Sequence, residues 1–251
     1  TTSGSLNLVG NKDDNFATVA DSNINSALDE EGNAKPTTIV AGGTVKVDTL
    51  DKTTTIDGFN GNLEAANTSD IKVGDKGLTG NIGVDGNVNG KLTSTGKIDG
   101  DVTVGGSVGE IALGGDVNNI SVGETLGKTD VANVKGDMTV GTAGGDITVK
   151  DGATVGGTLE VGNLGGKTVS ADKAGSVVVG GTGNVKVDNA GSLEVKTDAG
   201  SLTIEGQFVS ANDGNVTVAN SDTTTGMEVT ESVKVAGVSK ESKITDFNGD
   251  I

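Results

Sequence analysis

Carboxylates are the side chains of this chain with the clearest capacity for chemistry. They gather at Asp13-Asp14, at Asp29-Glu30-Glu31, and in turns that hold Asp99, Asp101, Asp213, Asp246 and Asp250. Calcium binds six to eight oxygen ligands and suits turns of Asp, Asn and Gly. Neither an EF-hand loop nor the nonapeptide of calcium-binding β-rolls is present. No cofactor is expected from these residues, and calcium is the one that could bind, with Asp13, Asp14, Asp246 and Asp250 as weak candidate ligands. The alternative is that each Asp forms a turn and stays solvated.

Several residue types that catalysis and ligand recognition normally need are missing. The sequence contains no His, Cys, Trp, Tyr or Arg, and only four Phe. Imidazole bases, thiol nucleophiles and the usual zinc ligands are therefore excluded. Bidentate Arg contacts and most aromatic stacking platforms are excluded as well. The residue types for two-carboxylate glycosidase chemistry are present, but that chemistry also needs a shaped pocket, normally with aromatic walls. We expect no catalysis.

The charge of the chain limits its partners. The net charge is −17 and the pI is about 4.2. Nucleic acids and anionic membrane surfaces both attract basic proteins, so neither is an expected partner. No stretch is long and apolar enough to insert into a membrane. The sequence begins at Thr1 without a Met, which is typical of a chain numbered after removal of a signal peptide. The expected location is extracellular or the cell surface.

Short apolar–x–apolar triplets recur along most of the chain and predict its fold. One class is followed by Gly and starts at residues 102, 120, 138, 159 and 177. A second class runs toward Asp or Lys-Asp, as in ITVKDG from Ile147 and VKVDNAG from Val185. Within the first class the step is 18 residues, with one of 21 (120 − 102 = 18; 159 − 138 = 21). The repeating unit is a coil of about 18 residues.

This pattern predicts a β-solenoid. Alternation places the outer two residues of a triplet on one face of a strand, and Gly, Asn and Asp supply the corners. One coil cannot bury its inner face alone, whereas stacked coils bury it against each other. A β-sandwich is the rival, but its strands are usually longer and its core more aromatic. Two-sided and three-sided cross-sections both fit the spacing.

Residues 1–44 differ from the body at 45–251. GSLNLVGN, near the start, predicts a strand. Residues 21–32 could form a short helix that Asp21 or Ser22 would cap at its start and Gly32 at its end. The region is expected to be an N-terminal arm or cap, with a partly disordered arm as the alternative.

The two ends of the body resemble each other. VKVDTLDKTTTIDGFNGNL, residues 45–63, aligns without a gap with VKVAGVSKESKITDFNGDI, residues 233–251 (233 − 45 = 188). The end of an uncapped solenoid is a strand edge that can pair with another chain. If the two segments form equivalent coils, one subunit can stack on the next in a head-to-tail contact, which gives open filaments. The expected interface residues are Phe59, Asn60, Gly61, Phe247, Asn248, Gly249 and Ile251. The alternative is a tandem module with a spacing of 188 residues.

Residues 80–110, GNIGVDGNVNGKLTSTGKIDGDVTVGGSVGE, resemble the bactofilins, polymer-forming β-solenoid proteins with recurrent I-x-G-D-V-x-V-x-G phrases. Residues 199–218, AGSLTIEGQFVSANDGNVTV, are similar to passenger and surface-layer segments of bacterial secreted proteins. Bactofilins are typically shorter and intracellular, and the long N-terminal region departs from them. Both groups are scaffolds, and many assemble end to end. The resemblance implies a structural role in a homopolymer, with other cell-surface components as further partners.

Three functions follow from these observations. The first is an extracellular structural protein whose subunits self-assemble head to tail into a filament or surface layer (S-layer). The second is an adhesin-type stalk or binding module, which predicts a monodisperse monomer. The third is a bactofilin-like intracellular scaffold, which predicts a start Met and no signal peptide in the parent gene.

Overall fold

A computed structural model describes the backbone of most of the chain. The described residues are 5–11, 14–20, 37–39, 43–50, 52–150, 152–180, 184–195, 201–203, 207–208, 215–218, 224–225, 228–229 and 232–235. Side chains are described for Leu6, Leu8 and residues 43–50, 52–150 and 152–180. All regular structure among these residues is β-strand. The possible helix at 21–32 lies outside them.

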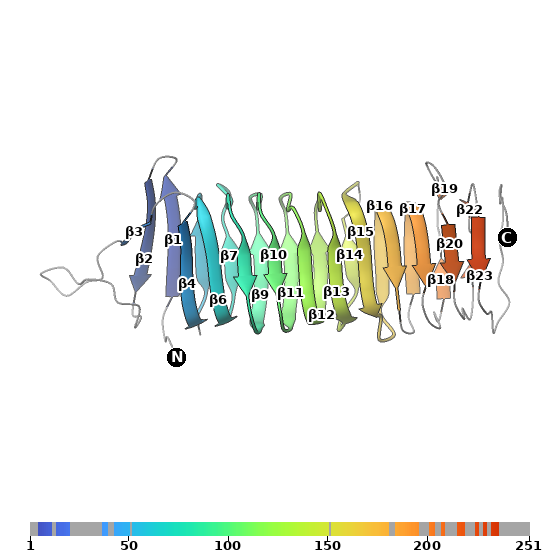
Figure 1. Cartoon of the computed structure of the whole chain (residues 1–251), viewed down its shortest axis with the longest axis horizontal. Helices are drawn as coiled ribbons and strands as arrows, with labels where there is room; N and C mark the ends of the chain where they lie inside the picture. Colours follow the sequence, from blue (N-terminus) through green and yellow to red (C-terminus); the bar gives the residue numbers. More distant parts are fainter. Residues whose placement is uncertain are drawn as a thin grey trace, which may run out of the picture. The chain divides into compact units, whose positions relative to one another are not determined.

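The chain forms two compact units, residues 1–124 and 125–251. The strands of the first unit are β1 (Ser5–Asn11), β2 (Asp14–Ala20), β3 (Thr37–Ile39), β4 (Gly43–Leu50), β5 (Thr54–Asp57), β6 (Gly61–Thr68), β7 (Ile71–Val73), β8 (Ile82–Val84), β9 (Val88–Ser94), β10 (Val102–Val104), β11 (Val108–Leu113) and the start of β12 (Ile120–Val131). The strands of the second unit, after the end of β12, are β13 (Met138–Ala143), β14 (Ile147–Val149), β15 (Thr154–Asn163), β16 (Thr168–Val179), β17 (Asn184–Val195), β18 (Ser201–Thr203), β19 (Gln207–Phe208), β20 (Asn215–Val218), β21 (Thr224–Thr225), β22 (Glu228–Val229) and β23 (Ser232–Val235) (Figure 1).

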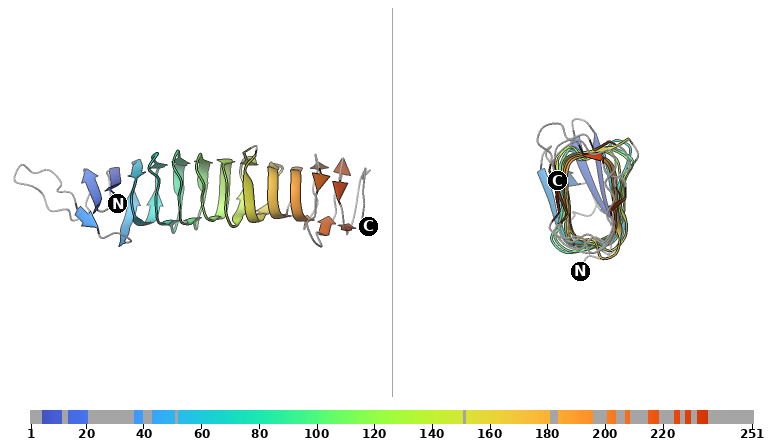
Figure 2. Two further views of the ribbon diagram at one scale, coloured as in Figure 1. Left: turned by 90° about the horizontal axis from the view of Figure 1, so that it is seen from above. Right: turned by 90° about the vertical axis from the view of Figure 1, so that its right-hand side faces the viewer.

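The first unit is a β-solenoid with two long faces. One face is the parallel ladder β4–β6–β8–β10–β12, and the other is β5–β7–β9–β11. A short side joins the faces through isolated parallel bridges that link Phe59, Leu78, Ile98 and Val117 in order. The opposite short side passes from Thr68 to Val88 to Val108. A coil therefore has two long and two short sides, as the end-on view in Figure 2 shows. The sequence pattern was compatible with both two-sided and three-sided cross-sections.

The core of the first unit consists of columns of aliphatic side chains. Leu63, Ile82, Val102 and Ile120 occupy equivalent ladder positions and are at most 1% exposed. Burying each such side chain stabilises the fold by about 1.5–3 kcal/mol. Phe59 is the only buried aromatic residue among the described side chains. The sequence pattern predicted this slim aliphatic interior, and the structure confirms it.

The second unit repeats the plan. One ladder runs β13–β15–β16–β17–β20–β23, and the other runs from the end of β12 through β14, β16, β17 and β18 to β21. Strands β16 and β17 contribute to both ladders because each continues around a corner. The separate pair β19–β22 is also parallel. The two predicted triplet classes correspond to these two ladders.

The coils vary in length around the predicted 18 residues. Val45 lies opposite Leu63 and Val102 opposite Ile120, a step of 18 in both cases (63 − 45; 120 − 102). Among the described ladder partners, the shortest step is 16, from Val169 to Val185, and the longest is 23, from Leu193 to Val216. The ladder register fixes the strands, so corners and loops absorb the extra residues.

The N-terminal region forms a small antiparallel sheet beside the first coil. β1 pairs with β2, and β2 pairs with β3, both antiparallel. β1 also pairs parallel with β5, which places Leu8 opposite Ile56. Leu6 and Leu8 are fully buried. The strand predicted at GSLNLVGN is therefore present as β1, and it extends the ladder that starts at β5.

Candidate assembly interface

The expected interface residues near the start of the body lie in the wall of a coil. Phe59 is fully buried and forms a parallel bridge with Leu78 of the following coil. Gly61 begins β6, opposite Gly43 of β4. A Cβ at Gly61 would lie 2.8 Å from the Phe59 ring and would overlap the Gly43 carbonyl oxygen. Phe59 and Gly61 therefore form a tightly packed corner, with the half-buried Asn60 between them.

The remaining candidates are not placed by the structure. Phe247, Asn248, Gly249 and Ile251 lie outside the described residues, as do the candidate calcium ligands Asp13, Asp246 and Asp250. Asp14 begins β2, opposite Asn11. Within the described residues, no group of three or more acidic side chains is placed to hold a metal ion. The interface and the calcium site stay predictions.

FNGDI, residues 247–251, shares its residue types with a corner phrase of the first unit. In the first unit FNGNL (59–63), LTGNI (78–82) and IDGDV (98–102) each run from a bridge residue through Gly and Asn or Asp to the first inward residue of a strand. FNGDI, residues 247–251, has the same order of residue types. Residues 45–63 span one coil, since Val45 and Leu63 are ladder partners. The equivalence of residues 233–251 to this coil stays a prediction, because residues 236–251 lie outside the described residues.

The Asn and Asp side chains of the corners bind the next coil. The amide of Asn81 donates to Oδ1 of Asn62 at 2.9 Å, and that of Asp101 donates to Oδ1 of Asn81 at 2.8 Å. A second column follows the same rule. The backbone amide of Asn87 donates to Oδ1 of Asn67 at 2.9 Å, and the backbone amide of Ser107 donates to Oδ1 of Asn87 at 2.7 Å.

The second unit has the same contacts, in which the amides of Thr154, Thr158 and Thr168 donate to Asn133, Asp137 and Asp146. Sequence reasoning missed this role and treated these residues as turn formers. The recurrence of Asn or Asp directly after Gly or Ala, at about the coil period, is the signal that could have found it.

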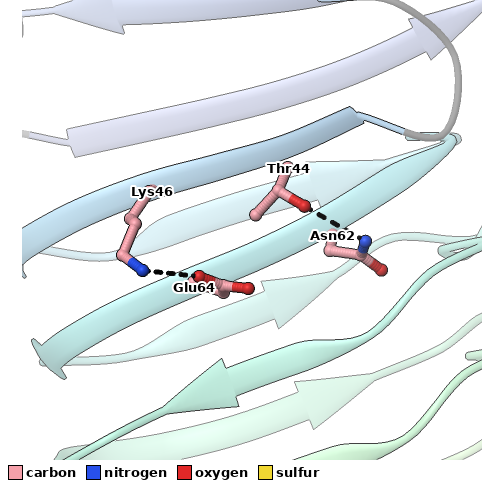
Figure 3. Close-up of polar contacts among 4 residues, drawn as sticks. All are labelled: Thr44, Lys46, Asn62 and Glu64. Carbon is pink, nitrogen blue, oxygen red and sulfur yellow. Dashed lines mark hydrogen bonds and ion pairs between the residues drawn. The ribbon is translucent and has the colours of Figure 1, made fainter.

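The outer faces carry side-chain contacts between successive coils as well. Nζ of Lys46 on β4 lies 3.1 Å from Oε2 of Glu64 on β6, and Nδ2 of Asn62 donates to Oγ1 of Thr44 at 3.3 Å (Figure 3). The hydrogen bond and charge of Glu64 raise the pKa of Lys46 above its ordinary value of 10.5. Glu110 raises the pKa of Lys91 in the same way, across a 2.6 Å contact. Lys46, Glu64 and Lys91 are exposed and Glu110 is half-buried, so each pair is largely solvated and contributes little.

One shallow surface hollow, of about 360 Å³, lies over β4, β6 and β8. It is lined by Lys46, Val47, Asp48, Glu64, Ala65, Ala66 and Asp85. The hollow is open to solvent and includes the Lys46–Glu64 ion pair. Val47 and Ala65 are buried beneath it, and its other residues belong to the outer strand surface and its edges.

Comparisons with known proteins do not add to this description. No protein-family model, no curated protein sequence and no solved structure matches the chain. The described residues also include no helix of the length and apolarity that a membrane crossing requires.

Proposed function

We propose that this chain is an extracellular structural protein whose solenoid subunits assemble head to tail into a filament or surface layer, with no catalytic role. The observation that carries the proposal is the edge of β4. Among the described strands β4 pairs only with β6, on one of its two sides. A strand edge of this kind is a template for a strand from another chain. The acidic composition favours cations or a basic partner, and the resemblance of residues 199–218 to secreted surface-layer segments supports an extracellular location.

The repetition of the coil supports assembly between copies. Each coil presents the next one with the same elements: a parallel ladder, a tight Gly corner and Asn or Asp side chains that accept backbone amides. A coil from a second copy can offer these same elements. Residues 233–251 repeat the type and length of the coil at 45–63, so a C-terminal coil of one copy would suit the β4 side of another.

The expected joint uses both ends of the body. Phe59 and Gly61 shape the receiving coil from within its wall, and Asn60 lies between them. Phe247, Asn248, Gly249 and Ile251 would form the docking coil. Contact between unlike surfaces does not close on itself, so the product is an open chain of subunits. Calcium would favour this product by reducing the repulsion between subunits of charge −17.

The test is sedimentation velocity and electron microscopy over a range of concentrations, with calcium and then with chelator. The full chain is compared with a variant that lacks residues 244–251 and with the control Gly83→Ala, which changes an open position. We expect concentration-dependent polymers from the full chain and the control, and none from the truncated variant. Far-ultraviolet circular dichroism checks that each variant keeps its strands. Single particles under every condition would contradict the proposal and favour a monomeric stalk.

A further inference from the structure

The small N-terminal sheet, β1–β2–β3, is joined to the solenoid through a narrow contact. β1 pairs with β2 along its whole length, and β2 pairs with β3 through Asn15–Ala17. The contact with the body is shorter: only Asn7–Val9 of β1 pair with β5. Among the described residues, no other strand pairing links this sheet to the body. The sheet keeps its own hydrogen bonds if it separates from β5 as a unit.

The contact is apolar and register-specific despite its small size. Leu6 and Leu8 are fully buried, and Leu8 lies directly opposite Ile56. Separation would expose both leucines of β1 and the backbone edge of β5. The apolar face of β1 is complementary to the edge of β5. The same complementarity holds when β1 and β5 belong to different copies.

We infer that the N-terminal sheet is exchanged between copies of this chain, so that β1 of one copy docks on β5 of a second copy with Leu8 against Ile56. Such an exchange re-forms the contacts seen within one chain and needs no new complementarity, which makes it an accessible route to association. A second copy is the occupant because its β1 carries the residues and register that β5 is observed to accept. The inference goes beyond head-to-tail assembly, since a reciprocal exchange joins two N-terminal ends.

Disulfide trapping tests the exchange, because the chain has no cysteine of its own. Asn7 and Thr55 are direct register partners across β1 and β5. Partners this close can form a disulfide. The variants Asn7→Cys and Thr55→Cys are prepared separately, mixed at high concentration, and oxidised. We expect a mixed disulfide between residues 7 and 55 of different copies, identified by mass spectrometry, with a yield that rises with concentration.

A matched control uses partners inside the solenoid body. Lys46 and Glu64 face each other across β4 and β6. A mixture of Lys46→Cys with Glu64→Cys should give only background cross-linking between copies. The two double variants, Asn7→Cys with Thr55→Cys and Lys46→Cys with Glu64→Cys, show that each pair can form its bond.

Selective cross-linking of 7 to 55 at several times the control yield supports the exchange. Equal yields in the two mixtures, or a 7–55 bond that forms in the double variant but not in the mixture, overturn it. Head-to-tail assembly is scored separately, by sedimentation of the cysteine-free chain. Polymers without a 7–55 cross-link would therefore remove the exchange alone, and a 7–55 cross-link without polymers would remove only the proposed function.

Discussion

Gly80 and Gly83 are three residues apart, yet a side chain would meet very different surroundings at each. A Cβ at Gly80 would overlap the backbone carbonyl of Gly61 in the preceding coil, whereas the nearest atom to a Cβ at Gly83 is 3.8 Å away. We expect Gly80→Ala to destabilise the fold by about 3 kcal/mol or more, because the ladder holds the coils at a fixed spacing.

Gly83→Ala is the control, and we expect it to be neutral or to stabilise by up to about 0.5 kcal/mol, since Gly weakens a strand. Urea unfolding followed by circular dichroism gives both values. Equal effects of the two substitutions would contradict the assigned corner packing.

Thr54 and Thr129 each bury a hydroxyl that has no hydrogen-bond partner within the described part of the chain. An unsatisfied buried polar group costs about 1–3 kcal/mol, and a methyl group of similar shape removes that cost. We expect Thr54→Val to raise the free energy of unfolding by about 1 kcal/mol. Thr68→Val is the matched control, because the buried hydroxyl of Thr68 donates to the Ser69 carbonyl at 3.3 Å. A loss of stability in Thr54→Val would show that its hydroxyl has a partner.

At the scale of single residues, the sequence predicted which side chains face the core. Alternation in VTV and ISV placed Val102, Val104, Ile120 and Val122 inward, and all four are buried. Alternation could not predict the roles of Asn62 and Asn81. Their side chains bind amides about 20 residues away, and that partner depends on the local length of the coil.

The corner columns of Asn and Asp connect one element to the next. Oδ1 of Asn87 accepts the amide of Ser107 at 2.7 Å. We expect Asn87→Ala to destabilise the fold by about 1–2 kcal/mol, because this amide loses its acceptor. Asn87→Asp keeps an acceptor at this position and should keep most of the stability. Hydrogen exchange at Ser107 provides the local measurement: protection should fall in Asn87→Ala and persist in Asn87→Asp. Unchanged protection in Asn87→Ala would contradict the role of the side chain.

The ion pair between β4 and β6 predicts a dependence on alkaline pH. Glu64 raises the pKa of Lys46 above 10.5 in the folded state. A raised lysine pKa stabilises the fold below the unfolded value and loses that contribution as the pH rises through the folded value. We expect NMR titration to find the pKa of Lys46 above 10.5, and Glu64→Gln to return it toward 10.5. Because both side chains are exposed, 0.5 M salt should reduce the difference. A pKa that Glu64→Gln leaves unchanged would contradict the pairing.

At the scale of elements, the period of the coils was predictable and their cross-section was not. Triplets at 102, 120, 138, 159 and 177 reveal the long faces because two apolar residues mark each strand. The short sides are marked by single residues, such as Leu78 and Ile98. A single apolar residue between glycines is too weak a signal to define a side, so the number of sides stayed open.

For the whole molecule, the net charge should control association. Subunits that each carry −17 repel one another, and salt screens this repulsion over about 10 Å at 0.1 M. We expect the concentration needed for assembly to fall several-fold between 20 mM and 200 mM sodium chloride, as measured by light scattering. Calcium at matched ionic strength tests for a specific site, because a site would lower that concentration further. Assembly that weakens as salt increases would mean that attraction between opposite charges drives it.

The variation in coil length has a consequence for how such a chain can change over generations. Steps between ladder partners range from 16 to 23 residues, while each parallel strand still advances the ladder by one spacing, about 4.8 Å. Distance along a ladder therefore counts coils and not amino acids. Duplication or loss of one complete coil, such as residues 82–101, would change the ladder by one increment and keep every later face in phase. Loss of half a coil would interchange the two long faces. Gene segments that encode this fold are thus expected to gain and lose length in whole coils.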